Sequence, residues 1–119
     1  MGNPFCHVEL QTQDIAKAKK FYKELFDWKL KEDAETNYTM IEVGEGVGGG
    51  MMKNPVPGAP SQWMAYVLVE DVQASMKKAA SLGAKVLKEV TEIPGYGSFC
   101  VIADPTDAVL ALWQTKGKM

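Results

Sequence analysis

The feature of this sequence that most constrains its fold is an internal repeat. The segment Asp14–Phe26, "DIAKAKKFYKELF", places apolar residues at helical spacing behind an Asp suited to cap a helix. The segment Asp71–Leu82, "DVQASMKKAASL", repeats this design, and Gly83 supplies a left-handed stop. The residues expected on the inward stripes are Ile15, Ala18, Phe21, Tyr22, Leu25 and Phe26 in the first helix and Val72, Ser75, Met76, Ala79 and Leu82 in the second.

The stretches around the two helices also repeat. A strand-like stretch precedes each helix, "CHVELQT" in the first half and "MAYVLV" in the second. Three more follow each helix: "WKLKED", "YTMIEV" and "VGGGMMK", then "AKVLKEV", "SFCVIA" and "AVLALWQ". The sequence therefore predicts an α+β fold with βαβββ modules at 5–53 and 63–115, joined by a Pro- and Gly-rich linker at 54–62, in one domain spanning 1–119.

Charge and cysteine content exclude several classes of function. Thirteen basic and fifteen acidic residues give a net charge of −2, which argues against a nucleic-acid partner. No apolar run is long enough to cross a bilayer and no secretory leader is visible, so we expect a cytoplasmic protein with no membrane partner. Cys6 and Cys100 form no CxxC motif, which argues against a zinc ribbon or redox pair and favours buried free thiols.

Several longer stretches resemble a known superfamily. "FCHVELQTQDIAKAKKFYKELFDWK", "WMAYVLVEDV" and "DPTDAVLALWQ" resemble the vicinal oxygen chelate superfamily, which includes glyoxalase I, bleomycin-resistance proteins, fosfomycin-resistance enzymes and extradiol dioxygenases. They look most like its small bacterial branch that is labelled as related to lactoylglutathione lyase. The resemblance implies that the two modules form paired curved mixed sheets around a cavity that binds a small molecule. It also implies a homodimer.

The resemblance further implies where a metal would be held. Metal-dependent relatives carry a His seven positions before the helix-capping Asp, and His7 stands in that relation to Asp14. The positions that match the other ligands hold Met64 and Ala111. Because one imidazole is a poor metal site, we expect no cofactor and an incomplete site in which His7 is the only retained ligand. Binding of a divalent metal remains as an alternative.

Strand alternation sorts the residues that would face the implied cavity. His7, Glu9 and Gln11 share one face of the first strand, and Val8 and Leu10 share the face toward the helix. By the same parity, Met64, Tyr66 and Leu68 should face the cavity, and so should Val109, Ala111 and Trp113, with Leu110 and Leu112 toward the helix. The candidate ligand-binding residues are Gln11, Trp63, Met64, Tyr66, Tyr96, Ala111 and Trp113. Such a lining, which Trp28 and Tyr38 could extend, suits a flat or partly aromatic ligand.

Two glycine-containing segments have simple interpretations. Gly44–Gly49 matches GxGxxG, but the prolines that follow exclude the helix that a dinucleotide site needs, so we expect a turn into a glycine-lined strand. The segment Gly95–Gly97 is expected to form a hairpin turn, and by resemblance it could be a loop at the rim of the pocket.

Three functions remain open from sequence. One is a metal-dependent lyase, isomerase or dioxygenase, which Met64 and Ala111 disfavour. Another is a binding protein of bleomycin-resistance type. The third is a metal-free enzyme in which His7 and Glu9 transfer protons. We expect a small-molecule-binding member of the superfamily and leave open whether it catalyses a reaction.

Overall fold

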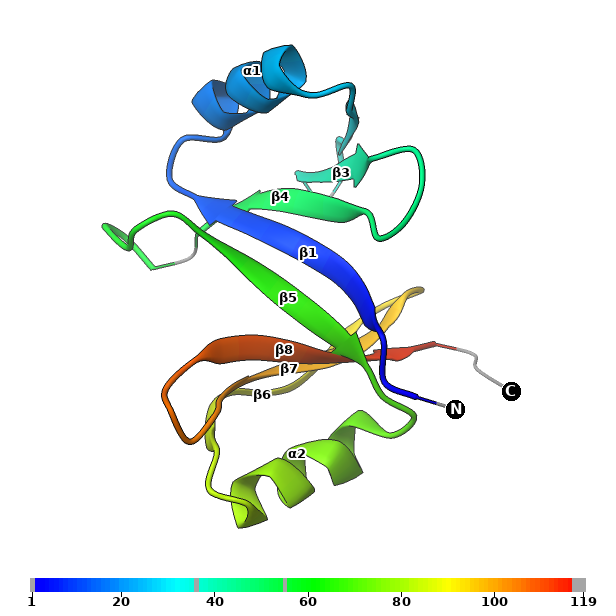
Figure 1. Ribbon diagram of the computed structural model, residues 1–119, viewed down its shortest axis with the longest axis vertical. Coiled ribbons are helices and arrows are strands. Elements are labelled where there is room, and N and C mark those ends of the chain that lie inside the picture. The colour runs from blue at the N-terminus through cyan, green and yellow to red at the C-terminus, as the bar shows by residue number, and fades with distance from the viewer. Residues whose placement is uncertain (1, 36, 55, 117–119) are drawn as a thin grey trace. The chain divides into compact units, whose positions relative to one another are not determined.

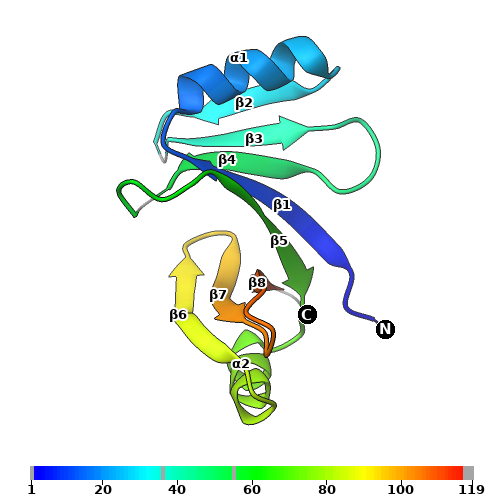
Figure 2. The ribbon, with the colours of Figure 1, turned by 60° about the vertical axis from the view of Figure 1, so that its left-hand side comes forward.

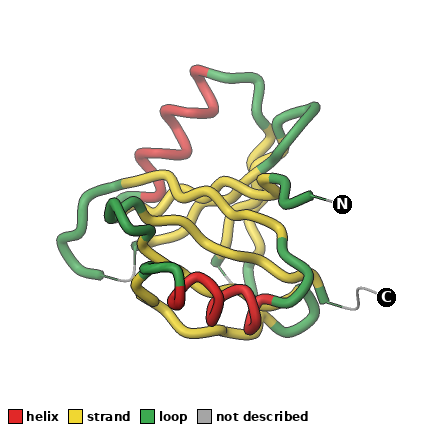
Figure 3. Tube along the Cα trace, turned by 60° about the horizontal axis from the view of Figure 1, so that its bottom comes forward, coloured by secondary structure: helices red, strands yellow, loops and turns green. Residues whose placement is uncertain are grey.

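A computed structural model describes residues 2–35, 37–54 and 56–116. The chain divides into two compact units, one formed by residues 7–64 and the other by 1–6 with 65–119. We call them the N-terminal and the C-terminal unit. The strands β1 (Phe5–Thr12) and β5 (Gln62–Leu68) have residues in both. In Figure 3 the strands are yellow, and the one helix of each unit among the described residues is red.

The N-terminal unit repeats the predicted order of elements. After β1 come α1 (Ile15–Leu25), β2 (Lys29–Asp33), β3 (Tyr38–Glu42) and β4 (Gly49–Lys53). The strand order is β2-β3-β4-β1; β4 is antiparallel to β3 and parallel to β1, and α1 packs on one face of these strands (Figure 1). Asp14 caps α1, since its Oδ1 accepts a hydrogen bond from the Lys17 amide.

The C-terminal unit has the same plan. After β5 come α2 (Val72–Ser81), β6 (Lys85–Ile93), β7 (Gly97–Ala103) and β8 (Val109–Thr115), with the strand order β5-β8-β7-β6 (Figure 2). As in the N-terminal unit, the first strand of the module is parallel to the last, here β5 to β8. The other two pairings, β6 with β7 and β7 with β8, are antiparallel. Asp71 caps α2, and Gly83, which follows the C-cap residue Leu82, has a positive φ. The predicted fold class and both βαβββ repeats are thus confirmed.

Each unit has a core on the predicted side of its strands. Leu10, Ile41 and Met51 are buried against Ile15, Ala18 and Tyr22 of α1 in the N-terminal unit. In the C-terminal unit the core lies between α2 and the sheet; its buried members are Val72, Met76, Cys100, Ile102 and Leu112. Strand parity therefore predicted correctly that Leu10 and Leu112 face the helices.

The predicted helix stripes were wrong at their ends. Phe26 and Leu82 follow the last residues of α1 and α2, where helical periodicity no longer applies, and Leu82 is 68% exposed. Phe21 and Leu25 lie within α1 but are also exposed. Phe21 lies about 100° around the helix from the packed Tyr22, and its exposed ring makes an edge contact with the Tyr22 ring, with centroids 4.9 Å apart.

The two cysteines differ in burial. Cys100 is fully buried, and burial raises the pKa of its thiol. Cys6 is only half-buried, which corrects the expectation of two buried thiols, and its Sγ contacts the Tyr66 carbonyl oxygen at 3.7 Å.

Neither helix among the described residues is long and apolar enough to span a membrane.

Candidate functional site

Three side chains of the N-terminal unit form one hydrogen-bonded network. His7 and Glu9 lie two residues apart on β1, so both project from the face opposite the helix. The Tyr38 hydroxyl, at the start of β3, lies 2.8 Å from His7 Nε2 and donates to Glu9 Oε2 at 2.8 Å. The imidazole and phenol rings are stacked with 25° between their planes. His7 and Glu9 thus lie on the same face of β1, as strand alternation predicted, and the Tyr38 hydroxyl connects their side chains.

Two amides extend this network. Gln11, the next residue on the same face of β1, donates from Nε2 to Glu9 Oε1 at 2.9 Å. Gln62 of β5 donates in turn to Gln11 Oε1 at 3.2 Å. Glu9 thus accepts a hydrogen bond on each carboxylate oxygen, and it is only 4% exposed. Buried carboxylates need such donors, because desolvation of an unpaired charge is costly.

A glycine makes room for Tyr38. Gly50 of β4 pairs with Glu9 on one side and with Met40 on the other. A Cβ at Gly50 would collide with the ring and hydroxyl of Tyr38. The glycine-lined strand predicted after the Gly44–Gly49 turn is present, and its close neighbour is this tyrosine.

The surroundings of His7 favour its neutral form. Burial is the larger effect and lowers the pKa of its imidazole, while the negative charge of Glu9 acts in the opposite direction. Desolvation therefore outweighs the carboxylate. The net pKa shift of His7 is therefore downward, although Glu9 by itself acts to raise it. A neutral imidazole at neutral pH has one protonated nitrogen and one nitrogen that can accept a proton.

An aromatic cluster lies elsewhere in the same unit. Trp63 donates from Nε1 to the Tyr22 hydroxyl at 3.3 Å, and its ring makes edge contacts with Tyr22 and Trp28. Phe26 packs on Trp28 with ring centroids 4.7 Å apart. These contacts give Trp63 and Trp28 a structural role beside α1, and a ligand-binding role of Trp63 remains a prediction. Met64, the following residue, is buried.

The remaining candidate residues belong to the C-terminal unit. Tyr66 of β5 pairs with Ala111 of β8, and the rings of Tyr66 and Trp113 make an edge contact with centroids 6.4 Å apart. Phe99 of β7 also contacts the Tyr66 ring. Tyr96 is 62% exposed in the β6–β7 hairpin turn, where its amide donates to the Ile93 carbonyl. That turn is confirmed, whereas its role at a pocket rim remains a prediction.

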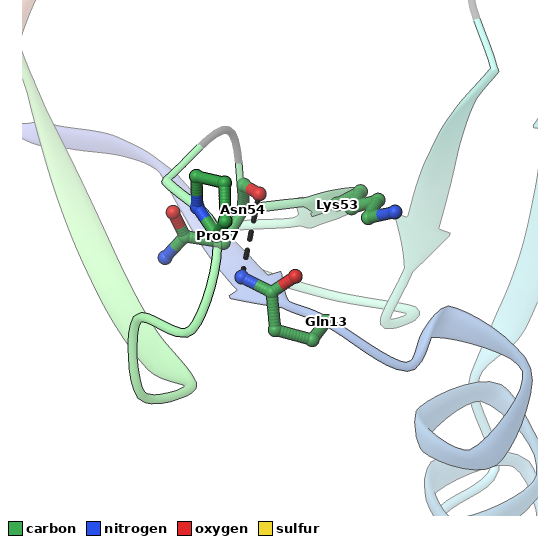
Figure 4. A pocket seen from close by; sticks show the side chains of 4 residues that line it. All are labelled: Gln13, Lys53, Asn54 and Pro57. Atoms are coloured by element: carbon green, nitrogen blue, oxygen red, sulfur yellow. Dashed lines mark hydrogen bonds between the residues drawn. The ribbon is translucent and has the colours of Figure 1, made fainter.

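A surface depression of about 320 Å³ lies where β1 and β4 end. Its lining residues are Gln13, Lys53, Asn54 and Pro57 (Figure 4). Gln13 Nε2 donates to the Asn54 carbonyl at 3.5 Å and to the Val56 carbonyl at 2.8 Å, so this amide anchors the linker to the end of β1. Since the polar side chains here secure the chain itself, we assign the depression no ligand.

Comparison with known proteins identifies the family. The model of the Glyoxalase/Bleomycin resistance protein/Dioxygenase superfamily matches residues 5–112. The chain belongs to this superfamily. Its members bind small-molecule substrates and often use a divalent metal.

Individual relatives differ in length and in the function that their names state. CFP32 of Mycobacterium tuberculosis (strain CDC 1551 / Oshkosh), named as a candidate glyoxylase, is 38% identical over 107 residues, 87% of this chain and 41% of CFP32. The anthracycline biosynthesis protein DnrV of Streptomyces peucetius is 24% identical over 128 residues, 93% of this chain and 46% of DnrV. The chain thus spans less than half the length of both superfamily relatives.

A solved structure supports the superfamily fold. Homoprotocatechuate 2,3-dioxygenase from Brevibacterium fuscum, in complex with 3,4-dihydroxyphenylacetate, superposes with a TM-score of 0.68 at 19% identity. The match covers 93% of this chain and 36% of the dioxygenase chain. At this identity the likeness shows the fold alone.

The described side chains do not fit the divalent metal used by other superfamily members. His7 Nε2 is engaged by the Tyr38 hydroxyl, and both Glu9 oxygens accept hydrogen bonds from Tyr38 and Gln11. Within residues 2–35, 37–54 and 56–116, no three His, Cys, Asp or Glu side chains are grouped closely enough to hold a metal ion.

Sequence reasoning did not identify the role of Tyr38. It treated this residue as one of several aromatics that could line a pocket, and it did not consider Gln62 or Gly50 individually. The signal present in the sequence is a Gly at 50 and a Tyr that begins a strand. Their juxtaposition depends on the β3–β4 and β1–β4 registers, which alternation alone does not give.

Proposed function

We propose that this superfamily member binds a small organic molecule beside the His7–Tyr38–Glu9 network, without a resident metal. The observation that carries the proposal is the convergence of an imidazole, a phenol and a buried carboxylate through two hydrogen bonds of 2.8 Å. Polar groups held in this way act as fixed hydrogen-bonding partners and need little reorganisation when a ligand binds.

An aromatic or partly aromatic ligand agrees best with the relatives. The name of DnrV refers to anthracycline biosynthesis, and the dioxygenase was solved with 3,4-dihydroxyphenylacetate. Both names therefore refer to aromatic chemistry.

The second candidate function is a metal-free reaction in which His7 and Glu9 act as acid and base. It is favoured by the lowered pKa of His7, because a neutral imidazole can accept a proton at neutral pH. The carboxylate of Glu9 would then stabilise the imidazolium through Tyr38.

Members of the superfamily often form oligomers, and we expect a homodimer, which sedimentation equilibrium would test.

The proposed binding is tested with the single histidine as a probe. Because His7 is the single histidine of the sequence, the one imidazole signal in an NMR spectrum reports on the network without further assignment. We expect 3,4-dihydroxyphenylacetate or an anthracycline to shift this signal saturably, and His7→Ala to weaken binding about tenfold, which corresponds to about 1.4 kcal/mol. Gln13→Ala, in the depression at the end of β1, is the control and should bind normally. Equal affinity of wild type and His7→Ala would contradict the proposal.

A further inference from the structure

We propose that Tyr38 is a positioning residue through which Glu9 determines which ring nitrogen of His7 carries the proton. The superfamily resemblance assigns Tyr38 no specific role. The proposal rests on the proposed function only in that His7 is the group that would contact the ligand. Its evidence is the order of donors and acceptors along the network.

The direction of the hydrogen bonds follows from the carboxylate. An ionised carboxylate only accepts, so the Tyr38 hydroxyl donates its single proton to Glu9 Oε2. The phenol oxygen is then left as an acceptor toward His7, 2.8 Å away. His7 Nε2 must therefore carry a proton, and in the neutral imidazole the basic lone pair resides on Nδ1.

Two amides keep the carboxylate oxygens in distinct roles. Gln62 donates to Gln11 Oε1, which leaves the Gln11 amide nitrogen as the donor to Glu9 Oε1. Oε1 is thereby paired with Gln11, and Oε2 is paired with Tyr38. Gly50 adds a steric condition, since the Tyr38 ring and hydroxyl occupy the space where any larger residue would place its Cβ.

This arrangement predicts a reversal in Glu9→Gln. The new amide would keep its oxygen toward Gln11 and turn its nitrogen, a donor, toward Tyr38. The phenol oxygen would then accept from residue 9, and its proton would point to His7 Nε2. A neutral His7 would in consequence carry its proton on Nδ1. Replacing one carboxylate oxygen of Glu9 by an amide nitrogen would thus exchange the donor and acceptor nitrogens of the His7 imidazole.

The test uses the intact chain labelled with ¹⁵N-histidine and needs no ligand. Long-range ¹H–¹⁵N spectra at about pH 8, above the ordinary His pKa, show directly which nitrogen is protonated. Spectra are compared for wild type, Glu9→Gln, Tyr38→Phe and Tyr22→Phe. The last is a matched loss of a hydroxyl in the same unit, from a tyrosine that contacts Trp63.

We expect the proton on Nε2 in wild type and Tyr22→Phe, on Nδ1 in Glu9→Gln, and a mixture of both forms in Tyr38→Phe. A proton on Nδ1 in wild type would overturn the inference even if every variant failed to fold. An unchanged tautomer in Glu9→Gln or Tyr38→Phe would also overturn it, because a purely structural tyrosine would leave the imidazole as it was. Failure of ligand binding would leave these spectra unaffected, so the two proposals fail separately.

Discussion

At the scale of single residues, the hydrogen bonds of the network converge on Glu9. Gln11 of its own strand and Tyr38 of β3 donate to Glu9, and Gln62 of β5 donates to Gln11. A carboxylate that is 4% exposed depends on such donors, so we expect the loss of one of them to affect stability as well as the site. The surroundings of His7, by contrast, favour its neutral form.

The lowered pKa of His7 predicts a pH dependence of stability. In the unfolded chain the imidazole titrates near its ordinary pKa of about 6.5, whereas in the folded chain it titrates lower. As the pH falls through the unfolded value, the unfolded state takes up the proton first, so folded-state stability is lost until the folded pKa is passed. The His7→Gln variant should not show this loss of stability, because glutamine does not titrate in this pH range.

Urea unfolding of wild type and His7→Gln between about pH 8 and pH 5 measures this difference. The wild type should lose stability relative to the variant only below about pH 7. Free energies of unfolding that run parallel over the whole range would show that the His7 pKa is not lowered by folding.

Gly50→Ala tests the space under Tyr38. The added methyl group would displace the tyrosine ring and separate its hydroxyl from His7 and Glu9. We expect a loss of about 1–3 kcal/mol in the free energy of unfolding and a shifted His7 imidazole signal. Gly2→Ala is the control, since a Cβ at Gly2 meets no atom within 4 Å. Wild-type stability and an unshifted signal in Gly50→Ala would refute the assigned contact.

At the scale of elements, the two helices differ although their sequences repeat. Both begin at an Asp that accepts a hydrogen bond from a backbone amide three residues later. Helix α2 buries Val72 and Met76, whereas no residue of α1 is fully buried. The helical stripe was therefore correct at Ala18 and Tyr22 of α1 and at Val72 and Met76 of α2, and wrong at Phe21 and Leu25.

This difference predicts unequal costs for two apolar residues of the second repeat. Met76 is buried in the core beside Leu112 and Ile102, and Met76→Ala should cost about 2–5 kcal/mol of unfolding free energy. Leu82 follows the end of α2 and is exposed, so Leu82→Ala should change stability by no more than about 0.5 kcal/mol. Thermal or urea unfolding measures both, and equal costs would contradict the assigned faces.

At the scale of the whole molecule, the repeat and the alternation of the strands predicted the α+β class and the two βαβββ modules, and the paired sheets were implied by the superfamily resemblance. Asp14 and Asp71 marked the helix starts, and the parity of Leu10 and Leu112 identified the core faces. The network around Glu9 could not be predicted in full, because it joins β1, β3 and β5 through registers that depend on turn geometry.

The central claim, ligand binding at the His7 network without a metal, is tested most directly by one titration. Whichever of 3,4-dihydroxyphenylacetate and the anthracycline shifts the His7 signal at the lower concentration is titrated into wild type with and without a strong chelator, and into His7→Ala. The account predicts the same dissociation constant with and without chelator and about tenfold weaker binding by His7→Ala. Binding that disappears in the chelator, or that is unchanged in His7→Ala, would contradict it.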